Sequence, residues 1–151
     1  MQRASKKWLA VSVAVVLVLA GAAYAGTWAW FEGNDVSRGT LSYFLGVPTS
    51  VKRLPIVDEC SAPKYRWRGR DGESPPFVSV DYSSRSGAKE ILRAYRTSLK
   101  QAACTSVKTE VIGPRTLTEF QCQDPDILSA SLWIGSESPC ASVELNIVEN
   151  Y

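Results

Sequence analysis

Basic residues at regular spacings are the side chains of this sequence that could bind a partner. In the segment KYRWRGR (64–70), a cation recurs at every second position, with an aromatic residue between successive cations at two places. On a β-strand, alternate side chains point to opposite faces, so the cations would share one face and the aromatic rings the other. Arginine binds phosphate and carboxylate groups through a planar fork. The candidate partner-binding residues of this segment are Lys64, Arg66, Trp67, Arg68 and Arg70.

A second basic row recurs at spacings of four, three and four residues on a predicted helix. It consists of Lys89, Arg93, Arg96 and Lys100, and only Glu90 is a close acidic partner on that helix. Side chains at these spacings share one face of a helix, so the row would form a ridge. Both rows indicate that the binding partner is an anionic lipid headgroup, an anionic glycan or an acidic peptide. The alternatives are an edge strand protected by charge and a solvated helix face.

Catalysis and metal binding are not indicated. The chain has no histidine, which excludes imidazole bases and histidine ligands. Asp124 and Asp126 flank a proline and fit a turn better than a catalytic pair, and the serines at 83–86 have no adjacent base. A net charge of +2 is too small for a nucleic-acid footprint. We expect no enzyme activity, no cofactor, no bound metal and no nucleic-acid partner.

The four cysteines predict two disulfides. Zinc sites usually pair ligands two to four residues apart, whereas Cys60, Cys104, Cys122 and Cys140 are widely spaced. Four cysteines allow three connectivities. The pairing Cys104–Cys122 is favoured because both residues flank one predicted hairpin, and Cys60–Cys140 then follows by elimination.

Apolar and polar residues alternate in several segments, which indicates strands. Clear strands are predicted at 77–82, 107–111, 118–122, 128–134 and 143–147, with an earlier one at 64–70. A single apolar stripe predicts a helix over about 87–103, with Ser86 as its N-cap. The order of elements indicates an α+β fold. We expect a two-layer domain over 56–151, in which one helix packs on an antiparallel sheet of about five to six strands.

The uncharged stretch 8–31 follows a cationic start that contains Arg3, Lys6 and Lys7. As a helix it would span about 36 Å, compared with about 30 Å for a hydrocarbon core. Aromatic residues favour the membrane interface at both ends. The sequence therefore predicts a transmembrane signal-anchor helix in 1–31, with a cytoplasmic N-terminus. The predicted interface residues are Trp8, Trp28, Trp30 and Phe31.

A cleavable signal peptide is the alternative for this stretch, because Ala23-Tyr24-Ala25 satisfies the small-x-small cleavage rule. The apolar stretch continues beyond that site, which favours retention. Segment 32–55 is then a juxtamembrane connector. Its apolar patch includes Tyr43 and Phe44, which we take as further candidates for partner contact.

These features predict a non-enzymatic single-pass protein of the cell inner membrane, with its C-terminal domain periplasmic or extracellular. An accessory or scaffolding subunit of a larger membrane protein complex is the first functional hypothesis. It would contact its partners through the helix and the domain. The alternatives are an extracytoplasmic module that binds an anionic ligand, and a secreted protein released by signal cleavage.

Overall fold

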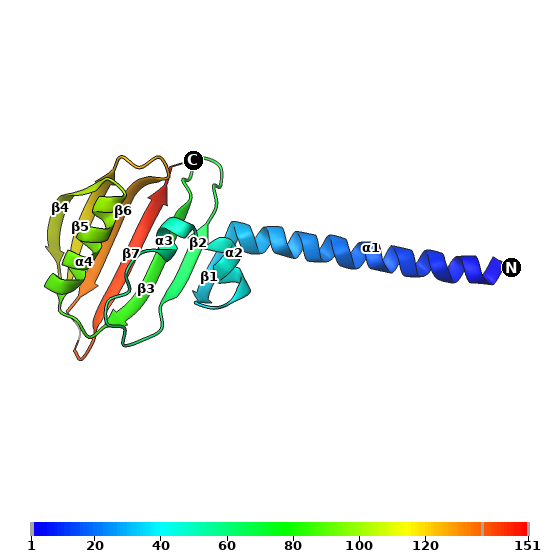
Figure 1. Cartoon of the computed structure of the whole chain (residues 1–151), viewed down its shortest axis with the longest axis horizontal. Helices are drawn as coiled ribbons and strands as arrows, with labels where there is room; N and C mark the ends of the chain where they lie inside the picture. Colours follow the sequence, from blue (N-terminus) through cyan, green and yellow to red (C-terminus); the bar gives the residue numbers. More distant parts are fainter. Residues whose placement is uncertain (1, 137, 151) are drawn as a thin grey trace.

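An antiparallel sheet of seven strands forms the main body of the protein (Figure 1). The computed structural model describes residues 2–136 and 138–150, without the side chains of 2–11, 25, 29 and 30. The strands are β1 (Glu32–Ser37), β2 (Lys64–Arg68), β3 (Phe77–Ser84), β4 (Cys104–Ile112), β5 (Arg115–Cys122), β6 (Ile127–Gly135) and β7 (Ala141–Glu149). The helices are α1 (Gln2–Phe31), α2 (Leu41–Gly46), α3 (Thr49–Lys52) and α4 (Ala88–Gln101).

The strand order is β1-β2-β3-β7-β6-β5-β4, so β7 lies in the middle of the sheet. The three short helices α2, α3 and α4 lie over one face, while α1 projects away from the sheet (Figure 1). We call the face under these helices the covered face and the other the open face. Antiparallel partners share a face, so the register assigns each strand residue to one of the two.

The core lies between the covered face and α4. Tyr65, Val80 and Leu145 are successive partners across β2, β3 and β7, and each is at most 2% exposed. From the helix side, Ile91, Tyr95 and Leu99 are fully buried at spacings of four residues. These spacings place the three side chains on one helical stripe, so the apolar pattern of the sequence forms the contact between the two layers.

Trp67 shows why segment 32–55 belongs to the folded domain. A methyl group added to Gly33 of β1 or to Gly46 of α2 would overlap the Trp67 ring. The ring is therefore packed closely against both glycines, and only 4% of Trp67 is exposed. Residues of the expected connector thus close the end of the core beside β2.

The predicted fold class is wrong in its sheet and its helices. The sheet has seven strands instead of five to six, and three of the described helices lie over it where one was expected. The additional strand is β1, whose sequence EGNDVS has no apolar alternation. β1 forms because its backbone pairs with β2, and a pairing of that kind leaves no periodic signal in the side chains.

The predicted transmembrane helix is also corrected. Within the described residues, no helix combines the length and the apolar character needed to cross a membrane. What the structure shows is a helix outside the sheet with exposed apolar side chains, for example Val18 at 70% and Leu19 at 64%.

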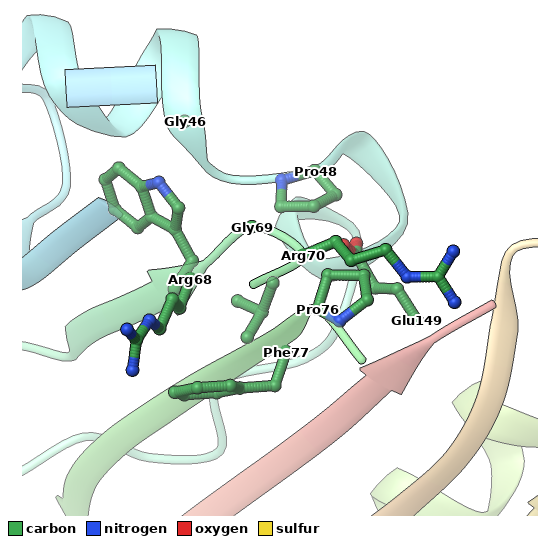
Figure 2. A pocket seen from close by; sticks show the side chains of 10 residues that line it. Gly46, Pro48, Arg68, Gly69, Arg70, Pro76, Phe77 and Glu149 are labelled. Atoms are coloured by element: carbon green, nitrogen blue, oxygen red, sulfur yellow. The ribbon is translucent and has the colours of Figure 1, made fainter. Parts of the chain in front are cut away.

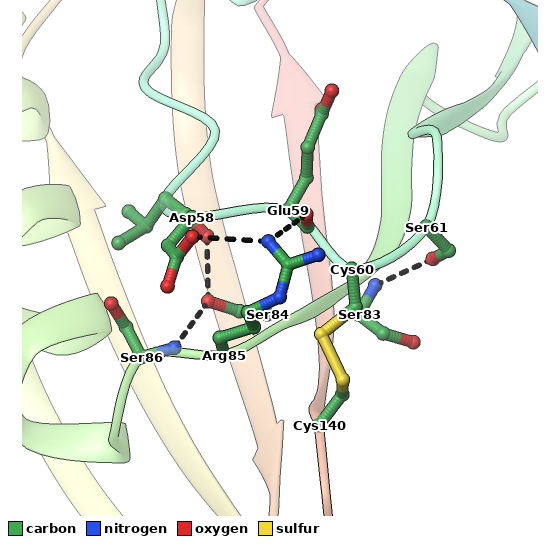
Figure 3. Close-up of a disulfide and its surroundings, with 10 residues drawn as sticks. Asp58, Glu59, Cys60, Ser61, Ser83, Ser84, Arg85, Ser86 and Cys140 are labelled. Carbon is green, nitrogen blue, oxygen red and sulfur yellow. Dashed lines mark hydrogen bonds and ion pairs between the residues drawn. A yellow bond between two sulfur atoms is a disulfide. The ribbon is translucent and has the colours of Figure 1, made fainter.

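Both predicted disulfides are present. Cys104 and Cys122 are direct partners in the β4–β5 register and form one bond, and Cys60 and Cys140 form the other. The second disulfide joins the segment before β2 to the start of β7 (Figure 3). Beside it, Arg85 Nη1 donates to the Glu59 carbonyl oxygen over 3.1 Å, so the segment is attached to the sheet by more than the sulfur bridge.

Candidate functional site

The basic side chains of KYRWRGR lie on the open face of the sheet. Arg66 and Arg68 are exposed there, while Tyr65 and Trp67 are buried on the covered face at 2% and 4% exposure. The alternation expected for a strand is therefore observed. Because β2 lies between β1 and β3, the explanation that these charges protect an edge strand is wrong. Trp67 is part of the core and offers no accessible surface to a partner.

Acidic side chains compensate much of this basic row. Lys64 Nζ lies 3.5 Å from Asp35 Oδ1, and Arg68 Nη2 lies 2.7 Å from Asp71 Oδ2. Arg66 Nε donates to the Ser79 hydroxyl over 3.4 Å. The positive charge available to an anionic ligand along β2 is therefore smaller than the sequence alone predicts.

Arg70 lines a pocket of about 380 Å³ at the end of β2 (Figure 2). The pocket also contains Arg68, Phe77 and Glu149. Burial raises the pKa of Glu149, and the nearby charge of Asp126 raises it further. The carboxyl group makes this pocket less suitable for an anion than its two arginines suggest.

A charged cluster that sequence reasoning missed lies on the open face, where β5 begins and β6 ends. Arg115 Nη2 pairs with Glu144 Oε2 at 2.7 Å, and the guanidinium group lies 5.0 Å from the centre of the Trp133 ring. Asn146 Nδ2 donates to Glu144 Oε1 over 3.0 Å. Arg115 therefore reaches across the Trp133 ring on β6 to a carboxylate on β7. The participants come from three strands, and no spacing in the sequence brings them together.

Opposite pKa shifts distinguish Glu144 from Asp81, its partner on β3. Burial raises the pKa of Asp81, and the charge of Glu144 adds to that effect. Burial acts on Glu144 in the same direction, but the hydrogen bonds from Asn146 and Arg115 outweigh it and lower the pKa. Both acids line an open pocket of about 480 Å³ with Lys64 and Arg115. This pocket presents both signs of charge, so it favours no anion.

The α4 ridge (Lys89, Arg93, Arg96, Lys100) differs from the β2 row in its lack of ion pairs among the described residues. All four residues are exposed, and within the described chain none of them forms an ion pair. The ridge lies on α4 above the covered face, whereas the cations of β2 lie on the open face. The two basic rows therefore do not form one surface.

The two apolar candidates in α2 lie in different environments. Tyr43 is 9% exposed and its ring packs edge-on against Tyr65 at 4.9 Å, so it belongs to the core. Phe44 is 63% exposed, next to Leu41 at 73% and Leu45 at 57%. Only the second group is accessible to a partner.

The expected membrane-interface residues are described in part. Trp28 and Phe31 are 57% and 38% exposed, and their rings lie 6.3 Å apart. The side chains of Trp8 and Trp30 lie outside the described residues. This pair of rings marks the end of α1 next to β1.

No group of three or more histidine, cysteine, aspartate or glutamate side chains among the described residues is arranged to hold a metal ion. No protein-family model matches this chain, and neither does any curated protein or solved structure with which it was compared. The functional argument therefore depends on the charges and surfaces described above.

Proposed function

We propose that the protein is a binding module for an anionic ligand and that the α4 ridge is its contact surface. The observation that supports this proposal is the exposed row of four cations without an acidic partner in the described structure. The β2 row is a weaker candidate because Asp35 and Asp71 pair with two of its cations.

The geometry of the ridge favours a ligand that repeats its charges along a line or a plane. The first and last cations lie eleven positions apart on the helix, which corresponds to about 17 Å. A lipid surface with anionic headgroups and a sulfated or carboxylated glycan both present charges at such separations. Each exposed lysine or arginine near an anionic membrane surface contributes about 1 kcal/mol. Salt screens exposed charges, so affinity should fall as ionic strength rises.

Charge reversal on the ridge tests this proposal. The variant Arg93→Glu/Arg96→Glu should bind at least tenfold more weakly to immobilised heparin and to vesicles that contain phosphatidylglycerol. The reason is that two attractive contacts become repulsive. Vesicles of phosphatidylcholine alone measure any contribution from the apolar side chains of α1 and α2. The heparin and vesicle arms also distinguish a glycan from a lipid source of the anionic groups.

The matched control is Arg53→Glu/Arg70→Glu, which changes the net charge equally. Both arginines are exposed and neither forms an ion pair in the described part of the chain. This control should retain binding. If both variants lose binding equally, the effect is one of general charge, and the assignment of the site to α4 is wrong. If only the control loses binding, the site lies at the end of β2. Circular dichroism confirms that each variant is folded.

The expected role as an accessory subunit of a complex stays a prediction, as does release by cleavage after Ala25. The first hypothesis included contacts through a transmembrane helix, and no described helix can supply them. The apolar group on α2 is exposed, but nothing in the described structure identifies what would cover it.

A further inference from the structure

β4 is an open edge of the sheet. Among the described residues no strand pairs with its outer side, and all of its residues after Cys104 are exposed. Val107 is 63% exposed, Val111 79% and Ile112 47%. An edge strand presents backbone N–H and C=O groups that another strand can pair with. Exposed β-branched residues along such an edge favour that pairing further.

Lys108 and Glu110 give this edge a charge pattern that is complementary to itself. Lys108 is the partner of Glu119 and Glu110 the partner of Leu117 in the β4–β5 register, so both side chains lie on the open face. Within one chain, Lys108 Nζ lies 2.8 Å from Glu110 Oε1. A lysine on an edge strand normally hinders pairing by burying an uncompensated charge. Here the glutamate two residues away provides the compensation.

We propose that two copies of this chain associate through antiparallel pairing of their β4 strands, centred on Thr109. In this register each Lys108 lies opposite Glu110 of the second copy. Opposite charges in directly facing positions stabilise an antiparallel pair, whereas like charges destabilise it. The two-fold symmetry makes this Lys108–Glu110 contact occur twice.

Neighbouring symmetric registers lack this complementarity. Centring the pair on Lys108 places the two lysines opposite each other, and centring it on Glu110 does the same for the two glutamates. The charges therefore select the register centred on Thr109. Because antiparallel partners share a face, the sheet would continue across the contact and the covered faces of both copies would point to the same side.

The length of the contact limits its strength. A register irregularity between Ser106 and Lys108 ends the regular part of β4, so the paired stretch is short. Small interfaces are typical of reversible association. We therefore expect a weak dimer that dissociates on dilution. This inference does not depend on the proposed anion binding.

Reversing each of the two charges in a separate variant tests the register directly. The full chain is measured by sedimentation velocity in a mild non-ionic detergent, over a range from about 1 to 200 micromolar. Lys108→Glu should raise the dissociation constant of the dimer at least tenfold, because glutamates then face each other. Glu110→Lys should do the same through facing lysines. An equimolar mixture of the two variants should dimerise again, because every facing pair in the heterodimer has opposite charges.

Arg53→Glu and Glu73→Lys are the controls, since they make the same charge changes at exposed positions away from β4. Both should dimerise like the unmodified chain. Restoration in the mixture also shows that neither single variant fails for lack of folding. If the unmodified chain is monomeric at 200 micromolar, the proposal is wrong. The β4 edge would then be available for pairing with a strand of another protein. Single variants that dimerise normally, or a mixture that stays monomeric, would overturn the proposal as well.

Discussion

Asp81 and Glu144 are adjacent partners on β3 and β7, yet their carboxyl groups affect stability in opposite directions. A pKa that is raised in the folded state means that folding disfavours the ionised carboxyl group, whereas a lowered pKa means that folding favours it. Asp81 has the raised pKa, caused mainly by burial. Glu144 has the lowered one, because the hydrogen bonds from Asn146 and Arg115 outweigh its burial.

Neutral substitutions should therefore change the free energy of unfolding with opposite signs at pH 7. Asp81→Asn should raise it by a few tenths of a kcal/mol, since the group is partly exposed and screened by water. Glu144→Gln should lower it by about 0.5 to 1 kcal/mol, because Arg115 loses a charged acceptor. Urea unfolding at a series of pH values measures both.

The pH dependence separates these effects from packing. The stability supplied by Glu144 is present above its unfolded pKa of about 4.3 and is lost as pH falls through the lower folded value. The gain from Asp81→Asn should vanish below about pH 4, because the carboxyl group is then protonated in both states. Differences that stay constant between pH 7 and pH 3 would show that ionisation is not the cause.

The sequence predicts side-chain orientation well where it depends on neighbours along the chain. The alternation in KYRWRGR correctly places Arg66 outward and Trp67 in the core, because a strand alone determines that alternation. The pair Arg115 and Glu144 could not be predicted in the same way. It depends on β6 lying between β5 and β7, a property of the sheet order.

The same distinction holds for whole elements. α4 and the strands of the second half carry periodic patterns that predict their positions, although β4 and β5 each begin three residues earlier than the patterns indicate. β1 has no such pattern. The start of α4 was misplaced by one residue, because its N-cap is Gly87 and not Ser86. Ser86 instead donates its backbone N–H to the Ser84 hydroxyl over 3.1 Å, which fixes the turn before the helix.

Gly87 leaves α4 without a side-chain cap, and this predicts a simple way to stabilise the helix. Its backbone is extended, with φ of −71° and ψ of 156°, and a Cβ added there meets nothing within 4 Å. Gly87→Ser and Gly87→Ala should therefore both fit. Gly87→Ser should be more stable than Gly87→Ala by about 1 kcal/mol, because only the serine hydroxyl can accept a backbone N–H of the first turn. Equal midpoints in urea would contradict this view of the helix start.

At the scale of the whole molecule, the two disulfides constrain the unfolded chain to different extents. The Cys60–Cys140 bond closes a separation of 80 residues and the Cys104–Cys122 bond one of 18. Because each bond lowers the entropy of the unfolded chain, the first should stabilise the folded state by about 4.5 kcal/mol and the second by about 3 kcal/mol. The sequence identified both pairs because one hairpin flanked by two cysteines left a single choice for the others.

Removing each bond by paired alanine substitution tests this order. Cys60→Ala/Cys140→Ala should lower the free energy of unfolding more than Cys104→Ala/Cys122→Ala does, as measured by urea titration of the oxidised proteins. Each double variant serves as the control for the other, because both lose one disulfide. The reverse order would show that the buried packing of Cys104 and Cys122 outweighs the entropy of the longer loop.

The central position of β7 determines when this domain can fold during synthesis. β7 separates β3 from β6, so until it leaves the ribosome the earlier strands form two groups, β1 to β3 and β4 to β6, that no sheet pairing connects. β3 and β6 are exposed edges at that stage, and unpaired edges expose a nascent chain to wrong pairing. Residues 141–149 therefore join the two halves in one step, and the complete sheet forms only after nearly all of its residues have been made.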